Sequence, residues 1–269
     1  MVGEIAEGSL TRHLVSLRSI PRPYSAATEH PFLSAAGLGT LNDSLLALWL
    51  SQDRIYAAHA YPRFIGLLIS KIPFCSSDAL DSREEEENQR VLKILAFSLD
   101  NVVREAAFFQ ETSQRWHLDM ECWKERKATR DYTAEMTRVS SYGSLEDGLV
   151  FLWAMEQVSG WLFNLQLRGA LGFKVSSKAY LDAWRHVASL LKNRENKSAI
   201  SSFAENWTSP EFEKFVSELA GLVDGLGIQP GSEGWKRAQV IWARIVELEE
   251  SFWPEEGEEL TMRLERQTT

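Results

Sequence analysis

The chain has 269 residues, 44% of them hydrophobic, and a formal net charge of −9. This negative charge argues against a nucleic-acid or anionic-membrane partner, because both need a basic face. Two cysteines, Cys75 and Cys122, make neither a disulfide framework nor a zinc site. No secretory signal and no bilayer-spanning apolar run is evident, so we expect a cytoplasmic protein with no membrane partner.

Helical spacing of apolar residues dominates the chain, and no segment alternates convincingly with period two. The apolar or helical segments expected, in chain order, are about 25–36, 42–62, 64–72, 91–109, a helix from about 132, 145–167, 178–191, 210–225 and 232–253. Between them, 126–130 has the composition of a connection and 169–177 that of a turn. Without repeats or a long linker, these elements predict one all-α domain.

Three helix starts carry capping signals. Thr40 or Asn42 can cap the helix that continues towards Pro62. Ser144 stands before another helix, with an aspartate three residues later. Ser209 precedes a proline and a glutamate, which is a strong signal for a helix start.

The helix that begins near Asn42 has polar residues in an otherwise apolar stretch. Gln52, Asp53 and Tyr56 stand where a purely structural helix would place leucine or alanine. This face of the helix therefore either reaches water or lines a pocket.

Short motifs in a fixed order resemble the TenA/thiaminase II proteins. The matching residues are His30-Pro31-Phe32, Gly39-Thr40-Leu41, Gln52-Asp53, Tyr56, Tyr132-Thr133 with Met136, Asn206-Trp207-Thr208-Ser209 before Phe212, and Glu249 with Phe252-Trp253. The resemblance covers about 29–253. It implies a single-domain, all-α haem-oxygenase-like helical bundle, a fold shared with pyrroloquinoline-quinone synthase. The implied limits are an N-terminal extension at 1–28, the helical domain at 29–257 and a C-terminal tail at 258–269.

The same resemblance implies roles for individual residues. Asp53 would hydrogen-bond an aminopyrimidine, with Tyr56 one helical turn further along the same face. Tyr132 and Trp207 would stack against or frame the flat ring, and Glu249 would shuttle protons. The implied partner is a small-molecule aminopyrimidine, and the implied assembly is a homodimer or homotetramer without a cofactor.

One departure from the family pattern changes the expected chemistry. Trp153 matches a tryptophan that follows the family's nucleophilic cysteine by two residues, so the nucleophile position falls on Phe151. Phenylalanine cannot attack carbon. The chain therefore resembles the branch without the cysteine, and we expect a cysteine-independent C–N hydrolase, an aminopyrimidine amidohydrolase or aminohydrolase of thiamine pyrimidine salvage. Phe151 could instead form an apolar wall of the pocket.

Glu156 lies in the near-continuous apolar helix, where an unpaired acid would be costly. It could pair with an arginine of another helix, the candidates being Arg63, Arg104 and Arg138. It could also be a second pocket carboxylate that activates water together with Glu249. Asp53 and Glu249 have a structural alternative as well, since acids on helices are usually solvated.

Two further functions stay open at the level of sequence. The chain could be a non-catalytic pyrimidine-binding or regulatory protein, because the nucleophile is missing. It could also catalyse a different reaction on the same scaffold, such as an oxidation in secondary metabolism by a haem-oxygenase-like enzyme. None of the five histidines forms the Glu-x-x-His pair of bundle di-iron sites, so we expect no metal and no cofactor.

Overall fold

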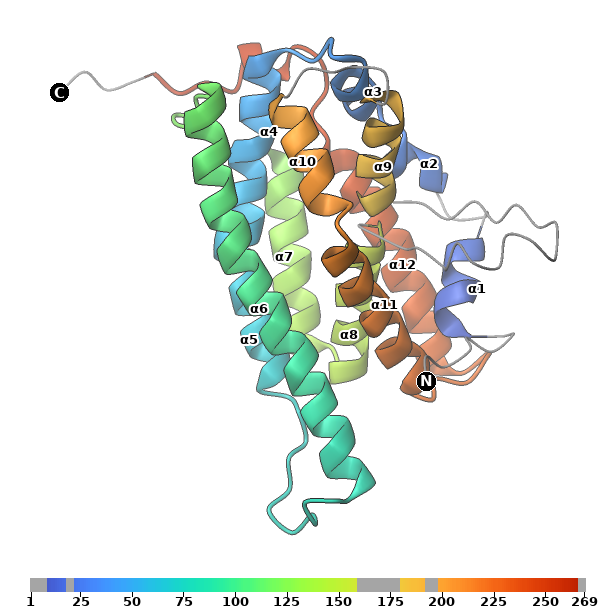
Figure 1. Cartoon of the computed structure of the whole chain (residues 1–269). Helices are drawn as coiled ribbons and strands as arrows, with labels where there is room; N and C mark the ends of the chain where they lie inside the picture. Colours follow the sequence, from blue (N-terminus) through green and yellow to red (C-terminus); the bar gives the residue numbers. More distant parts are fainter. Residues whose placement is uncertain (1–8, 18–21, 159–179, 192–197, 266–269) are drawn as a thin grey trace. The chain divides into compact units, whose positions relative to one another are not determined.

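The computed structural model describes residues 9–17, 22–158, 180–191 and 198–265. Within these ranges every regular element is helical, and the β-type pairing is limited to one isolated bridge between Trp123 and Arg263. The all-α prediction is therefore confirmed. The helices, labelled as in Figure 1, are α1 (Leu10–Ser16), α2 (Tyr24–Thr28), α3 (Pro31–Leu38), α4 (Asp43–Ile55), the π-helix η1 (Tyr56–Ala60), α5 (Tyr61–Ile69), α6 (Arg83–Trp116), α7 (Lys127–Tyr142), α8 (Leu145–Val158), α9 (Tyr180–Leu191), α10 (Ala199–Trp207), α11 (Pro210–Gly225), α12 (Glu233–Phe252) and the 3₁₀ turn η3 (Glu258–Leu260).

The chain divides into two compact units, each built from parts that are distant in sequence. Unit 1 comprises Met1–Thr40 and Val150–Glu250, and unit 2 comprises Leu41–Leu149 and Ser251–Thr269. Each unit is described by itself below. The domain limits at 28/29 and 257/258 stay a prediction.

In unit 1, α9 is the helix against which α2, α3 and α10 pack (Figure 1). Gly37 permits the close approach of α3, because a Cβ at this position would lie 2.7 Å from the Cβ of Leu190. Helix α1 is held on α11 by Thr11, whose backbone N–H and hydroxyl both donate to the carboxylate of Asp224, at 2.9 and 2.8 Å.

In unit 2, α5 packs against both α6 and α7, and α4 contacts α6, α7 and η3 (Figure 1). Asn42 is the N-cap of α4, because its side-chain oxygen accepts from the N–H of Ser44 at 2.8 Å. The helix does not stop before Pro62. It passes through the π-helix η1 into α5, whose first turn contains that proline. Such π segments are rare and often occur at functional sites.

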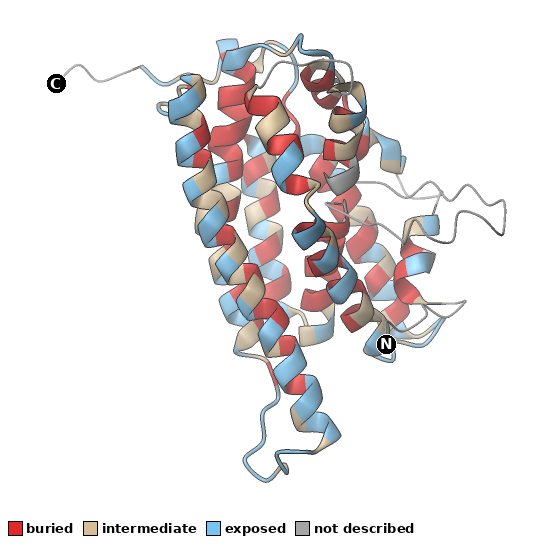
Figure 2. Cartoon of the chain, in the orientation of Figure 1, coloured by how far each residue is buried: buried red, intermediate tan, exposed pale blue. Residues whose placement is uncertain are grey.

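Helix α8 is the most enclosed helix in the described part of the chain. Figure 2 shows it buried over most of its length, and every residue from Gly148 to Gln157 is buried. Its predicted cap forms: the N–H of Asp147 donates to the hydroxyl of Ser144 at 3.1 Å. The rest of the expected helix, 159–167, and the expected turn at 169–177 lie outside the described residues.

The segment 25–36 is two helices rather than one. The ring nitrogen of His30 accepts from the N–H of Phe32 at 3.2 Å, and Pro31 occupies the first turn of α3. A capped start with proline begins a new helix, so α2 ends at Thr28.

The prediction that 126–130 is a connection was also wrong, because α7 begins at Lys127. No side chain of the segment itself caps this start. Instead, the N–H of Arg126 donates to the side-chain oxygen of Gln52 at 2.8 Å. A contact to a residue of another helix thus fixes the residue that precedes this helix, and local sequence could not indicate it. Helix α10, which ends at Trp207, was not predicted either.

Candidate functional site

Unit 2 brings three aromatic rings together from three helical elements. The ring of Tyr56 lies 5.1 Å from that of Tyr132, between centroids, and 5.8 Å from that of Phe252. Tyr132 and Phe252 meet edge to face at 5.8 Å and 89°. We refer to Tyr56, Tyr132 and Phe252 as the three-ring cluster. Aromatic pairs at these separations stabilise one another.

Asp53 lies one helical turn before the first of these rings. Its side chain is buried, with 4% of the residue exposed. The backbone N–H of Tyr56 donates to the carbonyl of Asp53, which places the two residues on adjoining parts of one helix face. The alternative that Asp53 is a solvated acid is thus wrong, because the residue is buried. A buried carboxylate requires hydrogen-bonding partners.

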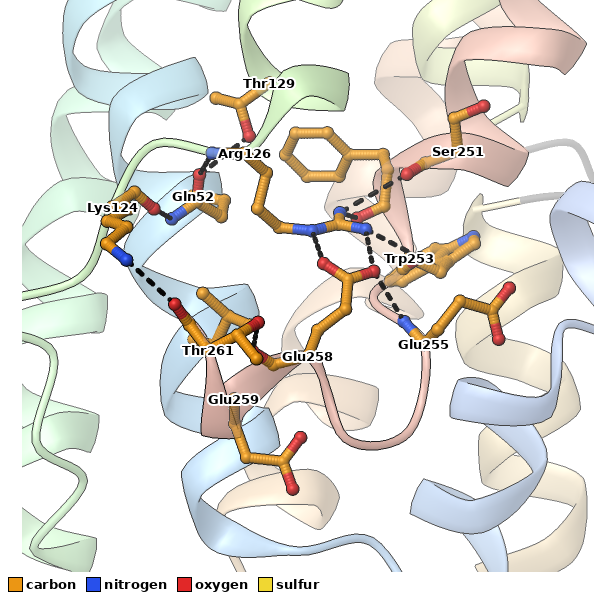
Figure 3. A network of polar contacts seen from close by, with 12 residues as sticks. Gln52, Lys124, Arg126, Thr129, Ser251, Trp253, Glu255, Glu258, Glu259 and Thr261 are labelled. Atoms are coloured by element: carbon orange, nitrogen blue, oxygen red, sulfur yellow. Dashed lines mark hydrogen bonds and ion pairs between the residues drawn. The ribbon is translucent and has the colours of Figure 1, made fainter. Parts of the chain in front are cut away.

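Gln52, the residue before Asp53, is completely buried and joins α4 to the start of α7 (Figure 3). Its side-chain oxygen accepts from the N–H of Arg126 and from the hydroxyl of Thr129, both at 2.8 Å. Its amide nitrogen donates to the carbonyl of Lys124 at 3.2 Å. The amide of Gln52 therefore determines how α7, which carries Tyr132, meets α4.

The guanidinium of Arg126 extends this network to the end of α12 (Figure 3). Nε and Nη2 donate to the two carboxylate oxygens of Glu258, both at 2.7 Å. Nη1 donates to the carbonyl of Phe252 at 2.6 Å, and Nη2 to that of Trp253 at 3.4 Å. Sequence reasoning missed the roles of Phe252 and Arg126, although Phe252 belongs to a motif that carries the family resemblance.

Unit 1 holds the other predicted acids. Glu156 on α8 is 9% exposed and Glu249 on α12 is 5% exposed, so neither lies on a solvated face. Their helices meet where the rings of Trp153 and Trp242 stack at 5.4 Å and 21°. Glu156 follows Trp153 by three residues and Glu249 follows Trp242 by seven. Helical periodicity therefore places both acids on the faces at which α8 and α12 meet.

Two of the arginines considered as partners of Glu156 form ion pairs within their own helices. Arg104 pairs with Asp100 at 3.3 Å, and Arg138 with Glu135 at 2.7 Å. A pairing of Glu156 with Arg63 stays a prediction.

Gln157 follows Glu156 in α8 and was not singled out from the sequence as a site residue. It is 1% exposed, and neither atom of its amide has a hydrogen-bond partner among the residues that the structure describes. Most buried side-chain amides in proteins have such a partner.

Trp207, predicted to frame the ligand ring, lies in an aromatic cluster of unit 1. Its ring stacks on Phe203 at 5.2 Å and 16°, and packs against Trp184 at 4.9 Å. These contacts give it a core function. A contact with a ligand stays a prediction for this residue.

The predicted site residues thus fall into two sets. Unit 2 gathers Asp53, Tyr56 and Tyr132, whereas unit 1 contains Phe151, Glu156, Trp207 and Glu249. In the part of the chain that the structure describes, no group of three or more histidine, cysteine or acidic side chains is placed to hold a metal ion. None of the described helices combines the length and apolar character needed to cross a bilayer.

Comparison with solved structures identifies the fold of this helical protein. A TenA homologue from Pyrococcus furiosus superposes with a TM-score of 0.68, covering 91% of this chain and 98% of that one at 20% identity. A TenA family transcription regulator from Silicibacter gives a TM-score of 0.67 over 91% of this chain and 95% of its own, at 17% identity. The chain therefore has the fold of the TenA homologues, and the resemblance inferred from its motifs is confirmed at this level.

Sequence comparison adds two curated relatives. A probable bifunctional TENA-E protein of Glycine max is 17% identical over 231 residues, which are 86% of each chain. A probable transcription factor of Fusarium pseudograminearum is 26% identical over 217 residues, which are 75% of this chain but only 42% of that protein. No family model matches the sequence. Membership of the branch without the cysteine stays a prediction.

Proposed function

We propose that the chain binds an aminopyrimidine through Asp53, with Tyr56 and Tyr132 against the ring, and hydrolyses a C–N bond of this ligand without a cysteine nucleophile. The observation that carries the proposal is the buried carboxylate of Asp53 one helical turn from Tyr56, whose ring contacts Tyr132. The TenA fold and the curated TENA-E relative support the same assignment.

The chemistry of the ligand suits these groups. The exocyclic amino group of an aminopyrimidine can donate to one carboxylate oxygen of Asp53, and the protonated ring nitrogen beside it can donate to the other. Such paired, charge-assisted hydrogen bonds are strong and directional. Flat aromatic faces such as those of Tyr56 and Tyr132 complement a flat heterocycle.

We assign the proton transfers of the hydrolysis to Glu249 and Glu156. One carboxylate takes a proton from water as the water oxygen attacks the carbon of the scissile C–N bond, and the other acid protonates the leaving nitrogen. The C–N bond breaks, a C–O bond forms, and the products are an amine or ammonia and an oxygenated pyrimidine or acid. No covalent enzyme intermediate is required, which agrees with Phe151 at the nucleophile position.

Calorimetry with 4-amino-5-hydroxymethyl-2-methylpyrimidine tests the binding site. We expect the wild type to bind, and we expect Asp53→Asn to weaken binding at least about tenfold, because the charged acceptor is lost. Asp43→Asn is the matched control, since Asp43 lies exposed in the first turn of the same helix. Absence of binding by the wild type would overturn the proposal.

The hydrolysis is tested separately with aminomethyl and formylaminomethyl analogues of the pyrimidine. We expect product formation by the wild type and its loss in Glu249→Gln, which retains the shape of the side chain but cannot exchange a proton.

A non-catalytic pyrimidine-binding or regulatory protein is the second candidate function. Phe151 favours it, because the motif resemblance implies that this fully buried residue stands at the position of the family's nucleophile. Binding without turnover of any analogue would select this alternative, whereas turnover that Glu249→Gln abolishes would reject it.

We further propose that the chain assembles as a homodimer or homotetramer, as the resemblance implies. Multi-angle light scattering of the purified protein tests this, and a monomer at all concentrations would contradict it.

A further inference from the structure

We propose that Arg126 and Glu258 are positioning residues, which hold the three-ring cluster in the geometry that accepts the ligand. We refer to Arg126, Glu258 and Gln52 as the clamp. This inference rests on the proposed binding function and assigns a role to Glu258, in the segment predicted from the sequence to be a C-terminal tail.

The ion pair between Arg126 and Glu258 fixes the orientation of the arginine side chain. Both carboxylate oxygens of Glu258 accept from Arg126, at 2.7 Å each, so the two planar groups meet side by side (Figure 3). The arginine side chain is 7% exposed and that of the glutamate 29%. A bidentate pair of this type fixes angles as well as distance, which a single contact cannot do.

The first ring that the clamp holds is that of Phe252. The carbonyl of Phe252 accepts from Nη1 of Arg126 at 2.6 Å, and that of Ser251 accepts from the same nitrogen at 3.3 Å. Carbonyls at the end of a helix lack partners within the helix, and a cation is favourable there. Arg126 therefore fixes the end of α12 at the residue whose side chain contacts both tyrosines.

The other two rings are held through the backbone of the same arginine. The N–H of Arg126 donates to Gln52, and Tyr56 follows Gln52 by four residues on α4 and η1. Thr129 donates to the same oxygen of Gln52, and Tyr132 follows Thr129 by three residues on α7. These spacings place each tyrosine one turn from its anchoring residue and on the same face.

Each element that supplies a ring is thus bound to the clamp by at least one hydrogen bond. Binding sites require their groups within a fraction of an ångström, and misplacement costs affinity even when the fold persists. Removal of Glu258 takes away the bidentate contact that orients the guanidinium towards the carbonyls of α12, while the backbone N–H of Arg126 keeps its bond to Gln52. We therefore expect the protein to remain folded while the rings lose their alignment.

The test compares Glu258→Ala and Glu258→Gln with Glu259→Gln. Glu259 lies on the same 3₁₀ turn but bonds to Asn42, at the opposite end of α4 from Asp53. Calorimetry uses 4-amino-5-hydroxymethyl-2-methylpyrimidine well below the unfolding temperature of every variant. We expect Glu258→Ala to raise Kd about tenfold, Glu258→Gln to raise it less because one acceptor remains, and Glu259→Gln to leave it unchanged.

Arg126→Lys is the second variant, because it keeps the charge but cannot make the bidentate contact; it should raise Kd like Glu258→Ala. A lower Tm with unchanged Kd in both variants would mean a merely structural role and would overturn the clamp. Equal effects of Glu258→Gln and Glu259→Gln on Kd would overturn it too. If the wild type binds no pyrimidine, the proposed function fails, whereas binding that Glu258→Ala leaves intact removes the clamp alone.

Discussion

The rings of Tyr56 and Tyr132 lie 5.1 Å apart with their planes tilted by 53°. The first ring belongs to a π-helix between α4 and α5 and the second to α7, so two distant parts of the chain supply one aromatic cluster in unit 2. Asp53, one turn before Tyr56, adds a buried carboxylate to the same stretch of helix. This combination of rings and a carboxylate is the basis for the proposed recognition of an aminopyrimidine.

Replacement of the second ring distinguishes a ligand-stacking role from core packing. We expect Tyr132→Leu to weaken aminopyrimidine binding about tenfold, because the flat aromatic face is lost. Tyr132→Phe keeps the ring and should bind nearly as well as the wild type. Calorimetry of the two variants provides the measurement, and equal binding by Tyr132→Leu and wild type would argue that this ring is only core.

For Trp207 we expect an effect on stability, because its ring packs in the core of unit 1. Its ring is packed between Phe203 and Trp184, so Trp207→Ala should lower the free energy of unfolding by about 3–5 kcal/mol, as for other large buried aromatic residues. Urea denaturation followed by circular dichroism measures this value. A loss below about 1 kcal/mol would show that the cluster does not form as described.

The contact between α8 and α5 can be tested with two glycines. An added Cβ at Gly148 would collide with the buried side chain of Leu68, so Gly148→Ala should destabilise the protein by about 1–3 kcal/mol. Gly66 lies exposed on α5 with no neighbouring atom within 4 Å of such a Cβ. Gly66→Ala should therefore stabilise by up to about 1 kcal/mol. Thermal unfolding of both variants checks the signs, and destabilisation by Gly66→Ala would contradict the packing.

Local signals in the sequence predicted the helical class and several helix starts. Asn42, Ser144 and Ser209 all accept hydrogen bonds from the first turns of their helices, because such caps depend only on neighbouring residues. The start of α7 was not predicted, because the contact that fixes it comes from a residue distant in sequence. The N–H of Arg126, the residue before this helix, donates to Gln52, which lies 74 positions away.

In the candidate site, too, local motifs could be predicted from the sequence, whereas contacts between distant residues could not. Asp53, Tyr56 and Tyr132 were indicated by motifs. Asp53 and Tyr132 are buried and Tyr56 is half-buried, which agrees with that interpretation without testing their roles. The contact of Arg126 with Glu258 spans 132 positions, and nothing in the composition of either segment indicates the pairing. Only the folded chain brings them together.

The most direct test of the central claim is a crystal structure of the wild type with 4-amino-5-hydroxymethyl-2-methylpyrimidine. We predict that the amino group and ring nitrogen lie within hydrogen-bonding distance of the Asp53 carboxylate, with the ring against Tyr56 and Tyr132. A pyrimidine bound away from Asp53, or none bound at saturating concentration, would contradict the account.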